Sequence, residues 1–141
     1  MTATDTAPAP AAATRPPLLG AVGIGVSDIA RSTDFYTRVL GMKVITTFSL
    51  DYMEEVVVGY GDRQAALVLM HWTDGSARNY RDNPIKIVLY VDSPEAAVDA
   101  IRADGLEIVR EPAPFGAAVI AFGKDPDGYL VELIQRAPMA G

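Results

Sequence analysis

Small and large side chains alternate over residues 21–26, as a β-strand with one packed face requires. Asp28 follows at the position of a helix N-cap, and apolar residues then recur at helical spacing until Gly41, which suits a left-handed C-cap. A second strand is expected over residues 42–48. The pattern therefore predicts a strand, a helix and a strand, with the apolar stripe of the helix buried against the large side chains of residues 22–26.

The same pattern occurs again in the second half of the chain. Residues 53–58 and 65–71 read as strands joined by a turn, and a polar connection covers residues 73–83. A strand over residues 85–91 follows, then a helix that begins after Ser93 and ends at Gly105, then strands over residues 106–109, 117–122 and 129–134. The halves match with a period of about 65 residues, which predicts one supersecondary unit used twice. The alternative is an α+β sandwich without a repeat.

Length and composition fit one domain with an ordinary core, since the chain has 141 residues and half of them are hydrophobic. Residues 1–17 are rich in Ala, Pro and Thr, so we predict a disordered leader there. A single domain is predicted over residues 18–137, with module one at 18–72, a linker at 73–83 and module two at 84–137.

Cysteine is absent from the sequence, which excludes disulfides, thiolate metal sites and a cysteine nucleophile. The net charge of −6 makes nucleic acid an unfavourable partner. No apolar run is long enough to span a bilayer, and residues 1–17 do not resemble a signal peptide. We therefore expect a cytoplasmic protein with neither a nucleic acid nor a membrane as partner.

Several short motifs have a specific resemblance. They are Val26-Ser27-Asp28, Asp34-Phe35-Tyr36, Leu40-Gly41-Met42, and Asp125-Pro126-Asp127-Gly128-Tyr129 with Glu132 three residues later. This set resembles the vicinal-oxygen-chelate superfamily, which includes glyoxalase I, extradiol dioxygenases and bleomycin resistance proteins, and it is most similar to bacterial glyoxalase I. The resemblance implies an α+β fold in which two tandem β-α-β-β-β modules form a pair of curled half-barrels with eight strands. It also implies a homodimer that binds a small organic molecule.

The resemblance to glyoxalase I implies a site for a divalent metal, which that family holds with His, Glu, His and Glu. The corresponding positions in this sequence are Ala21, Leu67, Lys86 and Glu132. Ala21 and Leu67 have no donor atom, and the ammonium of Lys86 would repel a metal ion. His71 lies four residues beyond Leu67, roughly 13 Å along the strand, which is too far to replace a ligand. We therefore expect no metal and no other cofactor.

The same two positions suggest a positive role, because the ammonium of Lys86 can stand where the metal would stand. We expect a Lys86–Glu132 ion pair at the floor of a pocket, and the alternative is that the pair only neutralises a buried carboxylate. Period two along the strands then gives the other expected pocket residues. They are Ala21, Gly23, Gly25, Leu67, Leu69, His71, Val88, Tyr90, Leu130 and Ile134, with Trp72 where the linker begins.

Two features near the predicted pocket stay open. The linker carries Trp72, Arg78, Tyr80 and Arg81, which suits a pocket mouth or a dimer contact but is also typical of a solvated loop. Glu54 and Glu55 are adjacent in a predicted strand, so one of them faces the pocket, and the pattern does not show which one.

Three functions follow from this reading. The first is a metal-independent, glyoxalase-like isomerase, epimerase or lyase acting on a carbonyl compound, with Glu132 as general base and Lys86 as electrophile. The second is a binding protein of the bleomycin-resistance type without chemistry. The third is a metal-dependent lactoylglutathione lyase, against which the four ligand positions argue.

Overall fold

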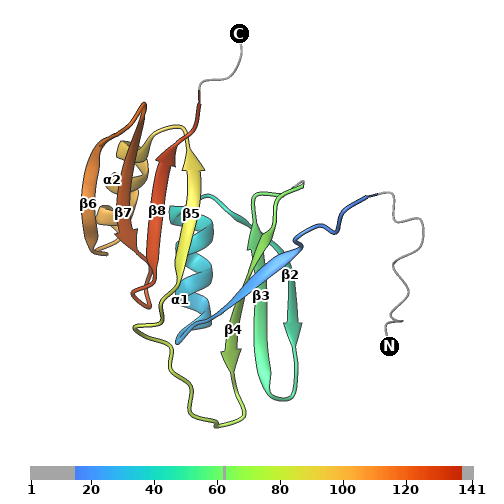
Figure 1. Cartoon of the computed structure of the whole chain (residues 1–141). Coiled ribbons are helices and arrows are strands. Elements are labelled where there is room, and N and C mark those ends of the chain that lie inside the picture. Colours follow the sequence, from blue (N-terminus) through green and yellow to red (C-terminus); the bar gives the residue numbers. More distant parts are fainter. Residues whose placement is uncertain (1–14, 62, 138–141) are drawn as a thin grey trace, which may run out of the picture.

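The computed structural model describes residues 15–61 and 63–137, which form two four-stranded sheets with a helix against each (Figure 1). The predicted leader over residues 1–17 lies largely outside the described residues. In the first half the elements are β1 (Ala21–Gly25), α1 (Ile29–Asp34), the π-helical turn η1 (Phe35–Val39), β2 (Lys43–Ser49), β3 (Met53–Gly59) and β4 (Ala66–Trp72). In the second half they are β5 (Lys86–Val91), α2 (Pro94–Ala103), β6 (Ile108–Phe115), β7 (Ala118–Lys124) and β8 (Leu130–Gln135).

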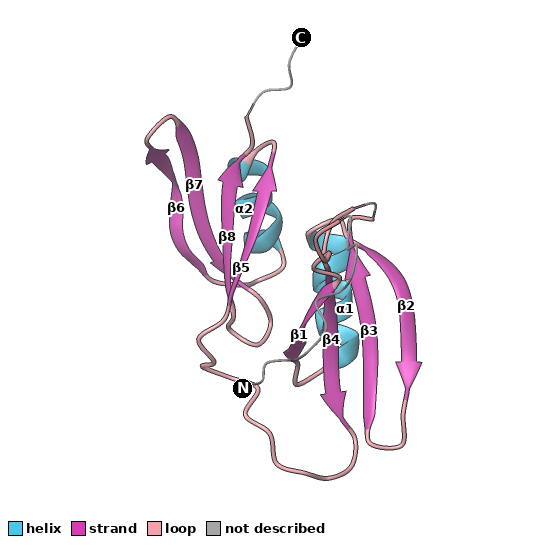
Figure 2. Ribbon diagram, turned by 45° about the vertical axis from the view of Figure 1, so that its right-hand side comes forward, coloured by secondary structure: helices cyan, strands magenta, loops and turns pink. Residues whose placement is uncertain are grey.

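The two sheets have the same topology. The strand order is β1-β4-β3-β2 in the first sheet and β5-β8-β7-β6 in the second. β1 pairs with β4, and β5 with β8, in parallel, and the other neighbouring strands are antiparallel. This confirms the predicted α+β fold of two β-α-β-β-β units. The sheets stand apart and do not close into a barrel (Figure 2).

Both helices begin at the predicted caps. The side chain of Asp28 accepts a hydrogen bond from the amide of Arg31, and Ser93 accepts one from the amide of Ala96. The first helix differs from the expected continuous α-helix, because its last turn, η1, is π-helical. Phe35 and Tyr36, at the start of that turn, are both fully buried. No helix among the described residues is long and apolar enough to span a membrane.

One hydrophobic core joins the two halves. Ile24 and Val26 of the first sheet pack with Phe35 of η1, and Val131 and Leu133 of the second sheet belong to the same cluster. The helices lie on the core side of the sheets, so strand residues of one parity are buried and their neighbours face away. This parity decides which side chains can line a site.

The turn at residues 125–129 holds the two halves together through buried polar contacts. The hydroxyl of Tyr36 donates to Asp125 Oδ2 at 2.7 Å, and the amides of Asp127 and Tyr129 donate to Asp125 Oδ1 at 2.9 Å each. Asp127 accepts hydrogen bonds from the amide and the hydroxyl of Ser27. The hydroxyl of Tyr129 donates to the carbonyl of Gly25 at 2.5 Å. Every carboxylate of the turn is therefore used, either within the turn or across the junction.

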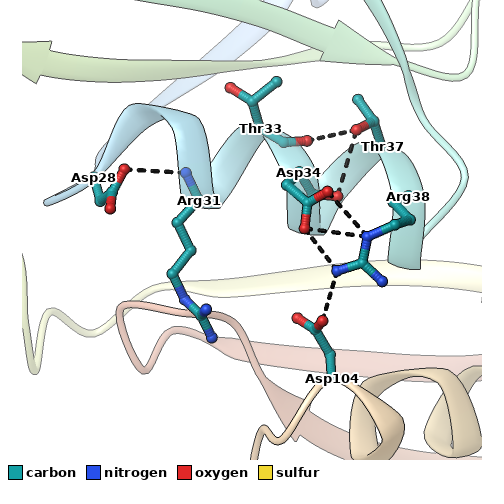
Figure 3. A network of polar contacts seen from close by, with 7 residues as sticks. All are labelled: Asp28, Arg31, Thr33, Asp34, Thr37, Arg38 and Asp104. Carbon is teal, nitrogen blue, oxygen red and sulfur yellow. Dashed lines mark hydrogen bonds and ion pairs between the residues drawn. The ribbon is translucent and has the colours of Figure 1, made fainter.

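An exposed ion-pair network adds a second connection between the halves (Figure 3). The guanidinium of Arg38 pairs with Asp34 in the same helix and with Asp104 at the end of α2, each at 2.6 Å. Because Arg38 and Asp34 are exposed, we expect this network to add less to the stability than the buried turn.

Removal of the Asp125 carboxylate should destabilise the protein strongly. Asp125→Ala leaves one buried hydroxyl and two amides without their acceptor, so we expect a loss of about 3 kcal/mol in the free energy of unfolding. Asp99→Ala is the matched control, because Asp99 forms an exposed ion pair with Arg102 at 3.3 Å, and it should cost under about 1 kcal/mol. Urea denaturation of both variants measures the difference, and equal costs would contradict the role of the turn.

The same contact predicts a dependence of stability on alkaline pH. Burial, and secondarily the nearby Asp125 carboxylate, raises the pKa of Tyr36 well above its ordinary value of 10.0. Between the ordinary pKa of tyrosine and the raised pKa of Tyr36, the unfolded chain has released the phenolic proton but the folded protein retains it. The contribution of Tyr36 to stability therefore falls as the pH rises through this range. Denaturation of the wild type and Tyr36→Phe from about pH 9 to about pH 11 should show a shrinking difference in stability. A constant difference would mean that Tyr36 titrates normally in the folded protein.

Candidate functional site

Each sheet has one face toward the helices and one face without a helix, which we call the helix-free face. In the first sheet the register pairs Gly23 with Val68 and Gly25 with Met70, so these residues share the helix-free face. In the second sheet Lys86 pairs with Leu130 and Val88 pairs with Glu132. Tyr90 and Ile134 continue the same face, so all the pocket residues predicted on β5 and β8 lie together on it.

The charged centre of the second helix-free face is an ion pair between Lys86 and Glu132. Lys86 Nζ lies 2.7 Å from Glu132 Oε1. The Glu132 side chain is 12% exposed and that of Lys86 is 50% exposed, so the glutamate is largely buried while the lysine is accessible to solvent. Phe122 pairs with Glu132 from the other side, on β7. Apolar neighbours thus flank one carboxylate whose charge is balanced by one lysine.

The first sheet has no charge at the equivalent positions. In the second sheet Glu132 lies two residues further along β8 than Leu130, the partner of Lys86. The same offset in the first sheet starts at Ala21, which pairs with Ala66, and leads to Val68. The residue equivalent to Glu132 is therefore Val68 and not Leu67, which corrects the sequence prediction by one residue. Val68 has no donor atom either.

The correction also applies to Leu69 and His71, which share the parity of Leu67 in β4. Leu67 and Leu69 belong to the hydrophobic core, where they are 8% and 0% exposed. His71 has the same parity, and its Nδ1 lies 2.8 Å from the carbonyl oxygen of Val26. The sequence placed these three residues beside Ala21 and Gly23, but the parallel register pairs Leu67 with Val22.

The sequence suggested that the glycines of β1 leave open space on one wall of a pocket, but the structure fills that space. A Cβ atom on Gly23 would lie 3.0 Å from the terminal methyl carbon of Met70. A Cβ atom on Gly25 would lie 3.2 Å from the ring of Tyr80 and 3.6 Å from that of Trp72. The missing side chains therefore make room for residues from β4 and from the linker.

The structure also separates the two adjacent glutamates of β3. Glu55 pairs with Met70 on the helix-free face. Glu54 pairs with His71 on the opposite face and accepts a hydrogen bond from the hydroxyl of Ser49 at 2.5 Å. Glu55 is thus the acidic residue that β3 adds to the helix-free face of the first sheet.

A groove of about 730 Å³ runs between the two halves along the edge of β5. Lys86, Val88 and Tyr90 of the predicted site line this groove, with Leu67 on its other side. Arg136 lies at the same groove and pairs with Asp92 at 3.4 Å. Glu132 does not line this groove, so the Lys86–Glu132 pair lies beside the groove and not at its floor, as the sequence had predicted.

Comparison with known proteins gives the family. The family model described as Glyoxalase/Bleomycin resistance protein/Dioxygenase superfamily matches residues 18–133. The chain belongs to this superfamily. Members that it resembles include the lactoylglutathione lyase of Escherichia coli O157:H7, which is 39% identical over 117 residues, covering 79% of this chain and 87% of that protein. The lactoylglutathione lyase of Neisseria meningitidis serogroup A is 37% identical over 119 residues, covering 79% of this chain and 85% of that one.

Solved structures of other superfamily members have the same fold. The trypanothione-dependent glyoxalase I of Leishmania major superposes with a TM-score of 0.71 at 28% identity, over 86% of this chain and 87% of that chain. Glyoxalase I of Zea mays superposes with a TM-score of 0.70 at 29% identity. This chain spans 45% of the length of the maize chain.

The parity of β4 can be tested with two neighbouring substitutions. Leu69→Ala opens a cavity in the core and should cost about 3 kcal/mol in the free energy of unfolding. Val68→Ala removes a half-buried side chain from the helix-free face and should cost about 1 kcal/mol. Chemical denaturation of both variants measures the costs. A larger cost for Val68→Ala than for Leu69→Ala would mean that Val68 faces the core, and that Leu67 is the residue equivalent to Glu132.

Proposed function

We propose that this chain is a glyoxalase-like enzyme that works without the divalent metal usual in glyoxalase I. It would move a proton on a small organic molecule that carries a carbonyl group. Glu132 would be the general base and Lys86 the electrophile that stabilises the developing oxyanion. The observation that carries the proposal is the 2.7 Å contact between Lys86 Nζ and Glu132 Oε1.

The donor set does not fit a divalent metal ion. The four positions that the resemblance assigns to ligands hold, after the correction by register, Ala21, Val68, Lys86 and Glu132, which together supply one carboxylate and one ammonium. Stable sites for such ions need three or more donors, and the ammonium would repel the ion. Among residues 15–61 and 63–137, no group of three or more His, Cys, Asp or Glu side chains is arranged to hold a metal.

The pair can supply both halves of a proton transfer. The carboxylate of Glu132 would take a proton from the carbon next to the carbonyl group, and the electron pair would move onto the carbonyl oxygen. The ammonium of Lys86 would donate a hydrogen bond to that oxygen and stabilise the enolate. Glu132, now protonated, would return the proton to the other face of the same carbon, which gives an epimer. Where that carbon carries a hydroxyl group, the hydroxyl proton would pass to the enolate oxygen and Glu132 would protonate the former carbonyl carbon, which gives the isomer with the carbonyl group shifted by one carbon. The products are an isomer or an epimer, and no oxidant or reductant is needed.

The surroundings of the pair support this role. Glu132 is largely buried among apolar neighbours, where the attraction between the pair and a charged intermediate is stronger than in water. Lys86 is half-exposed, so its ammonium would be accessible to a molecule bound over the helix-free face beside Glu132. The lyase names of the relatives further support an enzyme of isomerase or lyase type.

A binding protein without chemistry is the second candidate, and a specific observation favours it. Several large apolar side chains outside the core are exposed. They include Phe48 at 48%, Tyr90 at 64% and Phe115 at 66%. Such a surface suits the sequestration of a bulky apolar compound as well as contact with a second copy of the chain.

Hydrogen exchange at the carbon next to a carbonyl group tests the proposal without a known substrate. A panel of small 2-oxo acids, their esters and hydroxyketones is incubated with the protein in D₂O, and loss of the C–H signal is followed by NMR. We expect Glu132→Gln to lower the enzyme-catalysed exchange about 100-fold or more, and Lys86→Met to lower it about tenfold or more. EDTA should not change the rate.

Glu107→Gln is the matched control, because Glu107 pairs with Lys124 on the surface at 3.6 Å. This variant should exchange at the wild-type rate. Saturable binding of the panel without any exchange would favour the binding protein. Lactoylglutathione lyase activity that is lost with EDTA and restored by a divalent metal would overturn metal independence.

A further inference from the structure

A bulge in β6 turns Arg110 onto the helix-free face of the second sheet. In β6, Ile108 pairs with Gly123 of β7. Two residues later Arg110 pairs with Phe122, which is only one residue away from Gly123. Facing residues of an antiparallel pair share a face, so the extra residue in β6 puts Arg110 on the opposite face from Ile108. Phe122 is in turn the strand partner of Glu132, so Arg110 shares the face of that carboxylate.

Contacts on the helix side of the same sheet agree with this assignment. A Cβ atom on Gly123 would lie 3.1 Å from Cδ1 of Ile101 in α2, so Gly123 faces the helix. Glu111, the neighbour of Arg110 in β6, forms an ion pair with Arg102 of α2. Because successive residues of a strand point to opposite faces, Arg110 points away from α2. β-Bulges are over-represented next to active sites, where they redirect a side chain in this way.

Arg110, Phe122 and Glu132 form one row across the helix-free face. Strands β6, β7, β8 and β5 lie side by side in this order, and Lys86 Nζ meets Glu132 from β5 (Figure 1). Neighbouring strands are about 4.8 Å apart, so the Cα atoms of Arg110 and Glu132 lie about 10 Å apart, with Phe122 between them. One small molecule that lies over Phe122 can therefore contact both the guanidinium and the Lys86–Glu132 pair.

The charge of Arg110 is not balanced by a carboxylate among the described residues. Arg110 takes part in none of the ion pairs that they form. Lys86 on the same face is balanced by Glu132. Lys124, which shares this face as the strand partner of Leu130, is balanced by Glu107. Around the ion pair the face therefore keeps the positive charge of one guanidinium, which suits an anion with one negative charge, such as a carboxylate.

We propose that Arg110 binds a carboxylate group of the substrate over Phe122, so that the substrate class is an oxo acid whose carboxylate lies a few carbons from the carbonyl group. This inference rests on the proposed function, because the carbonyl group of the same molecule would meet Lys86 and Glu132. The Nη groups of Arg110 would donate two hydrogen bonds to the carboxylate. One strand spacing, about 4.8 Å, would separate the reacting carbon above Glu132 from the carboxylate, and 5-oxohexanoate has a chain of suitable length.

Ligand-observed NMR titration of the full chain tests this inference, with 5-oxohexanoate and its methyl ester as probes. We expect saturable binding of the acid to the wild type and about tenfold weaker binding of the ester. Arg110→Met should weaken binding of the acid about tenfold and leave binding of the ester unchanged. Arg110→Lys should fall between the wild type and Arg110→Met, because lysine keeps the charge but loses the planar pair of donors.

Arg102→Met is the matched control, because Arg102 contacts β6 through Glu111 from the helix side of the sheet. This variant should bind the acid like the wild type. The inference would be overturned by any of three results: no saturable binding of the acid, equal affinity of the wild type for acid and ester, or acid binding that Arg110→Met does not weaken more than Arg102→Met.

The exchange assay, extended to both probes, separates this inference from the proposed function. If Arg110-dependent binding of the acid is found without exchange, the carboxylate site stands and the enzymatic proposal fails. If exchange is found at equal rates for acid and ester and does not depend on Arg110, the enzymatic proposal stands and the carboxylate site is wrong.

Discussion

The buried hydrogen bonds between the turn at residues 125–129 and the first half of the chain are the constraint on which the structure depends. Asp125 binds the hydroxyl of Tyr36, Asp127 binds Ser27, and Tyr129 reaches the carbonyl of Gly25. Burial raises the pKa of Asp125, while the hydroxyl and the two amides that it accepts act in the opposite direction. The hydrogen bonds thus offset part of the cost of burying this carboxylate, and because they come from both halves they constrain how the two sheets meet.

The way the sheets meet defines the candidate site. Because both helices lie toward the shared core, each sheet presents its helix-free face outward, and residues of one parity alone reach it. The second sheet presents a buried carboxylate paired with lysine, whereas the first presents Val68 and Met70 with a glutamate, Glu55, beside them. Two copies of one unit have thus come to carry different chemistry on the same scaffold, and fold alone does not identify the function.

The proposed function uses the helix-free face of the second sheet. There the Lys86–Glu132 pair would supply a base and a partner for a developing oxyanion. Membership of the superfamily and the lyase names of relatives agree with an enzyme and do not name its substrate.

The sequence by itself determined the two β-α-β-β-β units and their caps, and its resemblance to the superfamily brought Lys86 and Glu132 together as a pair. Helix caps and strand alternation are local, so they can be predicted from neighbouring residues. The second unit was predicted because its pattern matches that of the first. The register of β4 was decided only in the tertiary structure, because Leu67 and Val68 are both apolar and local alternation does not say which one faces the helix. The filling of the space above Gly23 and Gly25 by Met70 and Tyr80, and the stacking of Arg78 on Trp72, depend on side chains from other segments. The role of Asp125 in joining the halves is also tertiary, since its partner Tyr36 lies far away in the sequence.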